Sequence, residues 1–156
     1  MLLIVFMYII EKIVRNVVTE MLTERLIKTL KLLPNVQPIN LNNMSQHYKK
    51  GRILRDGVLQ DLGGYGRPIA SFLVFEYDDY SNKIHTITDK GICIVQSPKS
   101  KKIITMFPIN YKNIEKYYKQ LEADSGRKYG VPTELDKDNI NKHKSQYQKI
   151  MRKRRV

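Results

Sequence analysis

Histidine and basic residues occur together in two stretches of this chain, the second of which also contains threonine, in a combination suited to cutting a phosphodiester bond. One stretch is residues 47–52 (HYKKGR), and the other is residues 83–108, which contain His85 and Thr105. RNA carries its own nucleophile, the 2′-hydroxyl. A protein that cuts RNA therefore needs a general base, a general acid, and cations or donors around the charged transition state. Histidine suits both proton-transfer roles near neutral pH.

On this chemistry the candidate catalytic residues are His47, His85 and Thr105. The candidate nucleic-acid-binding residues are the cations of the same two stretches and of the C-terminal end: Lys49, Lys50, Arg52, Arg55, Lys102, Arg152, Lys153, Arg154 and Arg155. Simpler interpretations stay open. His47 can be a solvated loop residue, His85 can face solvent from a half-buried strand, and Thr105 can be present as a good strand former. The cations can form a diffuse electrostatic patch.

Metal and cofactor chemistry have little support in the sequence. The three histidines fall in separate segments, and no CxxC or HxxxH pair and no phosphate-binding glycine loop occurs. Cys93 is the only cysteine, and its neighbours Ile92 and Ile94 predict a buried, poorly ionised thiol. We therefore expect no metal and no cofactor, and a reducing, cytoplasmic location.

The charge of the chain points to an anionic partner. The 156 residues include 28 lysine and arginine residues against 15 aspartate and glutamate residues, a formal net charge of +13. RNA or another nucleic acid is the first expectation, on a surface of the predicted sheet, and an anionic membrane is the second. An acidic protein such as an antitoxin is a further possible partner. The alternative is a soluble, lysine-rich protein whose composition follows an AT-rich genome.

The first ten residues are apolar, but the run is short. Ten helical residues rise about 15 Å, half the thickness of a hydrocarbon core of about 30 Å. Glu11, Lys12 and Arg15 then interrupt it. We expect no membrane span. Helical spacing predicts one long helix over residues 5–33, ended by Pro34. Its apolar first turns are expected either to start a core helix or to pack on a second copy in a homodimer.

The fold class predicted is α+β, with a long N-terminal helix, a central four-stranded antiparallel meander and C-terminal helices. Apolar runs ended by turns predict strands at 69–77, 83–88, 92–96 and 102–107. Within the second strand, His85 and Ile87 are expected on the face opposite to Ile84, Thr86 and Thr88. The whole chain is expected to form one domain, with 1–33 as the N-terminal helix, 45–126 as the core and 127–156 as a basic helix or arm.

Capping residues and glycines predict the remaining helices. Asn43 or Ser45 can cap a short helix, and a second short helix around 54–62 would end at Gly63 and Gly64.

A longer helix follows Asn110 or Asn113 and ends at Gly126. It presents apolar and aromatic side chains on one face: Ile114, Tyr117, Tyr118 and Leu121. These are expected to form core, with base stacking by the tyrosines as the alternative.

The middle of the chain resembles a known group of ribonucleases. The closing strand, residues 102–108 (KIITMFP), follows the hairpin of residues 85–96, and a helical segment with a histidine precedes them. This arrangement resembles the metal-independent ribonuclease toxin superfamily of barnase, EndoU, colicin and RelE type over residues 45–110. The resemblance implies His47, His85 and Thr105 as catalytic residues. No Arg-Gly pair follows His47 in the usual manner, and the long N-terminal helix and the basic tail are additions to that pattern.

The function expected is a metal-independent endoribonuclease of toxin or phage-accessory type, a hydrolase-like RNA-cutting activity that starts from the 2′-hydroxyl. Two alternatives stay open. One is a non-catalytic nucleic-acid-binding or regulatory protein, and the other is a small phage-type inhibitor that binds a host protein.

Overall fold

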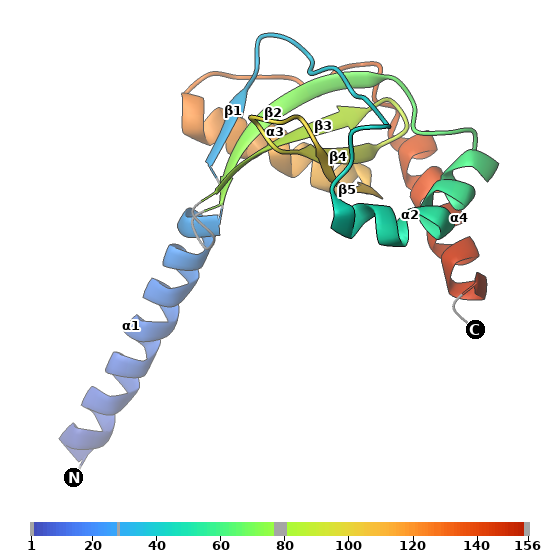
Figure 1. The fold of residues 1–156 in the computed structure, drawn as a ribbon. Helices are drawn as coiled ribbons and strands as arrows, with labels where there is room; N and C mark the ends of the chain where they lie inside the picture. Colours follow the sequence, from blue (N-terminus) through green and yellow to red (C-terminus); the bar gives the residue numbers. More distant parts are fainter. Residues whose placement is uncertain (1, 28, 77–80, 155–156) are drawn as a thin grey trace.

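The chain folds into a curved antiparallel sheet with helices on both faces (Figure 1). The computed structural model describes residues 2–27, 29–76 and 81–154, and the side chains of 17–27, 47, 50–54, 76 and 81 lie outside that description. In chain order the elements are α1 Leu2–Ile27, β1 Thr29–Leu32, α2 Gln46–Asp61, β2 Pro68–Glu76, β3 Ser81–Thr88, β4 Ile92–Gln96, β5 Ile103–Pro108, α3 Tyr111–Ser125 and α4 Lys137–Arg154.

The sheet is a meander of five strands in the order β1-β2-β3-β4-β5, and all its pairs are antiparallel. The α+β class, the N-terminal helix and the C-terminal helices are confirmed, but the prediction of four strands was wrong. The additional strand is β1, whose residues lie within the helix predicted over residues 5–33. Leu30 fits a helical spacing, yet in the structure it is buried, pairs with Val74 and donates its backbone N–H to Asp124 Oδ2 at 2.8 Å. Pairing with a distant strand decided the local structure here.

Alternate residues of each central strand enter two separate cores. Cys93 and Val95 of β4 pack with α3 in the first core, whereas Ile92 and Ile94 pack with α2 and the segment before it in the second. All five residues of β4 are therefore buried. In β3 the expected alternation is confirmed, because Ile87 lies in the first core and Thr86 hydrogen-bonds Ser71 across the sheet at 2.7 Å.

The helix on the first face follows the sequence closely. Asn110 caps α3 by accepting a hydrogen bond from the backbone N–H of Asn113, and Gly126 ends the helix in a left-handed conformation. The four expected core residues of α3 are buried.

The helix on the second face differs from the prediction. Ser45 caps α2, and a single helix runs through to Asp61 where two short helices had been expected. Near the C-terminal end of this helix, Val58 and Leu59 are buried, and such tertiary packing supplies most of the stability of a helix.

The last helix, α4, settles the choice between a helix and a disordered arm. It starts against the first core through Ile140 and reaches the second core through Tyr147. Ile140 approaches the turn between β3 and β4 so closely that a Cβ atom at Gly91 would lie 2.6 Å from its Cγ2 atom. Gly91 also has a φ of +76°, so two independent constraints favour glycine there.

The first helix, α1, projects away from the sheet (Figure 1). Every described side chain between residues 2 and 16 is exposed. Within the part of the chain that the structure describes, no helix is long and apolar enough to cross a membrane.

Gly91→Ala tests whether α4 is held against the β3–β4 turn. Gly126→Ala is a matched control, since Gly126 has a φ of +71° and nothing lies within 4 Å of its Cβ position. The control should lose about 1 kcal/mol of unfolding free energy, because alanine is strained in a left-handed backbone conformation and meets no other obstacle there. Gly91→Ala should lose about 2 to 4 kcal/mol because the methyl group also displaces Ile140. Urea unfolding measures both, and equal losses would show that α4 does not pack on this turn.

Candidate functional site

His85 lies inside the first core, not on a solvent-facing surface. Its ring is 5 % exposed, and its Nδ1 atom is 2.7 Å from the hydroxyl of Tyr117 on α3. The Cys93 sulfur lies 3.8 Å from the same nitrogen. The interpretation of His85 as a solvent-facing strand residue is therefore wrong, because α3 covers this face of the sheet. Tyr117 and Tyr118 are both buried, and burial, with Glu134 nearby, raises the pKa of Tyr118 to about 12.

Within the part of the chain that the structure describes, no contact joins His85 to either of the other two candidate catalytic residues. His85, Val95 and Thr105 form one row across three strands, so the His85 and Thr105 backbones are roughly 10 Å apart. Thr105 is half-buried, with its Oγ1 atom 3.5 Å from Nη1 of Arg55. The side chain of His47 lies outside the described residues. The catalytic assignment thus stays a prediction.

The predicted nucleic-acid-binding cations lie on several surfaces. Those with exposed side chains are Lys49, Lys102, Arg152, Lys153 and Arg154. Arg154 forms an ion pair with Asp61 at 2.8 Å, which links α4 to α2. Both partners are substantially exposed, so this pair adds little stability. The side chains of Lys50 and Arg52, and the whole of Arg155, lie outside the description.

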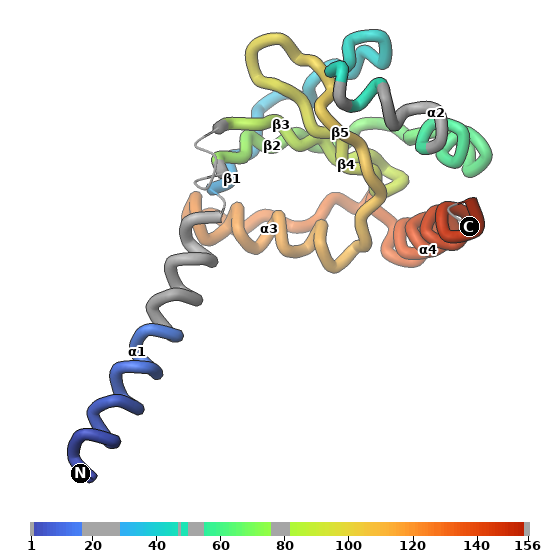
Figure 2. Tube along the Cα trace, turned by 60° about the horizontal axis from the view of Figure 1, so that its bottom comes forward, coloured from blue at the N-terminus to red at the C-terminus, as the bar shows by residue number. Residues whose placement is uncertain are grey.

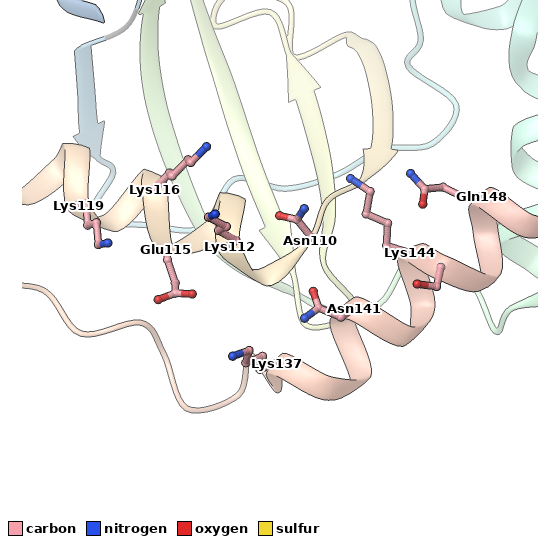
Figure 3. A pocket seen from close by; sticks show the side chains of 10 residues that line it. Asn110, Lys112, Glu115, Lys116, Lys119, Lys137, Asn141, Lys144 and Gln148 are labelled. Carbon is pink, nitrogen blue, oxygen red and sulfur yellow. The ribbon is translucent and has the colours of Figure 1, made fainter.

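A cleft of about 700 Å³ lies between α3 and α4, and none of those predicted cations lines it. Figure 3 shows the side chains around the cleft, which come from both helices. They include five lysines and one glutamate, a surplus of four positive charges. The lining residues are Asn110, Lys112, Glu115, Lys116, Lys119, Lys137, Asn141, Lys144, Ser145 and Gln148.

The two helices are fixed relative to each other at this cleft. Asn141 of α4 accepts a hydrogen bond through Oδ1 from the backbone N–H of Tyr111, the first residue of α3, at 2.9 Å. Ile114 and Ile140 are fully buried in the same core on the other sides of their helices. The cleft is thus supported by packed apolar faces, while the polar faces of both helices form its wall.

The backbone adds positive potential to the lysines. The N-terminus of α3 opens at the cleft through Asn110 and Lys112, and α4 begins at its wall with Lys137. Helix N-termini carry partial positive charge from their unpaired N–H groups. The first turn of α3 has no acidic residue, whereas that of α4 carries Asp138. At α3, Asn141 and Asn110 already accept hydrogen bonds from the backbone N–H groups of Tyr111 and Asn113, so the lysines supply most of the positive potential that suits an anion.

The cleft is equipped for binding. Its ammonium groups can pair with phosphates, and its amide and hydroxyl groups can hydrogen-bond sugars or bases. No histidine lines it. Within residues 2–27, 29–76 and 81–154, no three histidine, cysteine, aspartate or glutamate residues lie close enough to hold a metal ion.

Sequence reasoning missed this cleft because it treated residues 112–119 and the C-terminal tail as separate basic stretches. A signal was present. Lys112, Lys116 and Lys119 recur at helical spacing on the side of α3 away from its apolar face. That they meet Lys137 and Lys144 depends on how α4 packs, and the spacing within one helix does not specify that.

Comparison with known proteins finds no matching family model, no matching curated sequence and no matching solved structure. The resemblance to the ribonuclease toxin superfamily therefore stays a prediction.

His143 occupies the face of α4 that packs on the fold. It is 8 % exposed, and neither ring nitrogen has a hydrogen-bond partner among the described residues. Burial, followed by the nearby positive charge of Lys90, lowers the pKa of His143 below its usual value. The folded protein therefore holds this imidazole neutral where an unfolded chain would begin to protonate it.

We expect His143 to make the fold sensitive to acid. The unfolded-state pKa is about 6.5, and the folded-state value is lower, so below that pH the unfolded chain binds more protons. The stability contributed by neutral His143 is complete above this pH and is lost as the pH falls, with a slope of up to about 1.4 kcal/mol per pH unit. In urea unfolding, His143→Leu should lose less unfolding free energy than the wild type between neutral and acidic pH. Gln146→Ala, exposed on the same helix, should keep the wild-type slope; an unchanged slope in His143→Leu would contradict the assignment.

Proposed function

We propose that this protein binds RNA or another nucleic acid through the cleft between α3 and α4. The observation that carries the proposal is the convergence of five lysines, from two helices that follow each other in the chain, on one recess of about 700 Å³. A folded chain that gathers like charges in one place bears a repulsive energy, which a bound polyanion removes.

The remainder of the protein supports the same partner. The net charge of +13 favours encounter with a polyanion over long range. Exposed cations at Lys49, Lys102, Arg152 and Lys153 extend the positive potential beyond the cleft. Phosphate contacts made by lysines carry little sequence information, and the amides of Asn110, Asn141 and Gln148 are the groups in the cleft able to contact bases.

The ribonuclease hypothesis remains a second proposal, with a specific structural requirement. His85 and Thr105 share one cross-strand row, but His85 is 5 % exposed and lies against Tyr117. Cutting RNA with His85 would require α3 to move away from the sheet. Binding in the α3–α4 cleft requires no such movement, and the geometry therefore favours binding.

A partner protein is the other alternative. An acidic protein, such as an antitoxin or the host target of a phage-type inhibitor, would meet the same positive surface. RNA would then fail to compete for the protein partner or would bind with no preference for the cleft. A cytoplasmic location, expected from the lone cysteine, stays a prediction.

Replacing Lys112, Lys116 and Lys144 together with glutamine should weaken binding to a fluorescent single-stranded oligouridine by about tenfold or more at low salt. The slope of log affinity against log salt should fall by about 2, since each lysine–phosphate contact on a single strand contributes about 0.7. Fluorescence anisotropy over a salt series measures both quantities.

A matched control removes the same charge from other exposed sites, by replacing Lys31, Lys99 and Lys128 with glutamine. It should lose much less affinity and keep most of the salt slope. Equal losses in the two triple variants would show that binding follows net charge and not the cleft.

Incubation with total RNA in EDTA separates binding from cleavage. A protein that only binds leaves the RNA intact at micromolar concentration, and we expect this result, checked by denaturing gel electrophoresis. Cleavage by the wild type that disappears in both His47→Ala and Thr105→Ala would instead establish the ribonuclease. The cleft triple variant serves as the comparison: it should lose binding if the cleft holds the RNA, and it should still cut RNA if His47 and Thr105 act at a separate site.

A further inference from the structure

The first nine described residues of α1 form an apolar helix surface that nothing in the described chain covers. Residues 2–10 are all aliphatic, sulfur-containing or aromatic, and their exposure ranges from 45 % at Ile10 to 90 % at Leu2. Figure 1 and Figure 2 both show this end of α1 standing clear of the sheet and of the other helices. Exposed apolar surface of this extent marks a site of interaction.

The distribution of these side chains around the helix restricts the occupant. A helix that pairs with one other helix needs only a stripe of apolar residues about 100° wide, with polar residues on the rest of its surface. Over residues 2–10 the apolar residues occupy every position and therefore every side. A single partner helix would leave half of them in water, whereas a hydrocarbon layer surrounds a helix on all sides.

The length and the charges that follow match one half of a bilayer. Nine helical residues rise about 14 Å, and the hydrocarbon thickness of one leaflet is about 15 Å. The next turn carries Glu11, Lys12 and Arg15 beside the exposed Ile13 and Val14, and Arg15 pairs with Glu11 at 2.6 Å. These charged residues sit well at the level of the lipid headgroups.

The net charge of the whole chain indicates that the lipid headgroups are anionic. A net charge of +13 attracts the protein to a surface of anionic headgroups. Insertion of an apolar segment together with electrostatic attraction gives the two contributions that stable peripheral attachment requires. We propose that residues 2–10 of α1 insert into one leaflet of an anionic membrane and hold the folded domain at its surface.

The absence of tryptophan from the chain makes a direct test available. Phe6→Trp places a single tryptophan in the middle of the apolar segment of the full-length protein. On addition of phosphatidylcholine–phosphatidylserine vesicles, its emission should shift to shorter wavelength, and lipids brominated on the acyl chains should quench it. An unchanged spectrum overturns the proposal.

Two charge variants in the Phe6→Trp background make the test specific. Ile9→Lys places a charge inside the proposed hydrocarbon segment and should reduce the fraction of protein that floats with vesicles by about tenfold. Val36→Lys adds the same charge at an exposed apolar residue outside α1 and should bind as the parent does. Equal flotation of the two variants overturns the proposal.

The remaining outcomes identify the competing occupants. Binding that survives Ile9→Lys but disappears when Lys112, Lys116 and Lys144 become glutamine would assign the lipid surface to the cleft. An emission shift without vesicles that grows with protein concentration, together with a dimer in sedimentation, would assign α1 to a second copy of the chain. Either result overturns membrane insertion.

Discussion

The sheet of this protein is stable only if both of its faces are covered, because its central strands carry apolar side chains on both sides. In β4, Cys93 and Val95 enter one core while Ile92 and Ile94 enter the other. The chain meets this requirement with α3 on the first face and α2 on the second (Figure 2). Helix α4 contacts both cores, through Ile140 and Tyr147, and so its position depends on both.

The lysine-lined cleft is a consequence of that packing. The apolar face of α3 and Ile140 of α4 are committed to the first core, so the polar faces of the two helices turn outward beside each other. A hydrogen bond from the Tyr111 backbone to Asn141 fixes their junction. Two unit charges about 4 Å apart in water repel by about 1 kcal/mol, and salt screens this over about 8 Å. The cleft therefore gains stability from any bound anion and from added salt.

The proposed membrane attachment and the proposed nucleic-acid binding would use different parts of the molecule. Residues 2–10 lie at the far end of α1 (Figure 1), whereas the cleft lies between α3 and α4 (Figure 3). A protein held at an anionic surface by its apolar end would bring its basic cleft close to that surface, where headgroups and nucleic acid would compete for the same lysines. The ionic strength would then influence which of the two ligands occupies these lysines.

Much of the fold was determined by the sequence alone. The positions of β2 to β5, the cap at Asn110, the stop at Gly126 and the alternation along β3 all follow from short-range periodicity and turn chemistry. Tertiary contacts decided the rest. Residues 29–32 became an edge strand because β2 offered them backbone partners, and His85 was buried because α3, more than 25 positions later in the chain, covers its face. The cleft also depended on tertiary contacts. The spacing of lysines within each helix can be read from the sequence, but the position of α4 beside α3 depends on side-chain packing that this spacing does not specify.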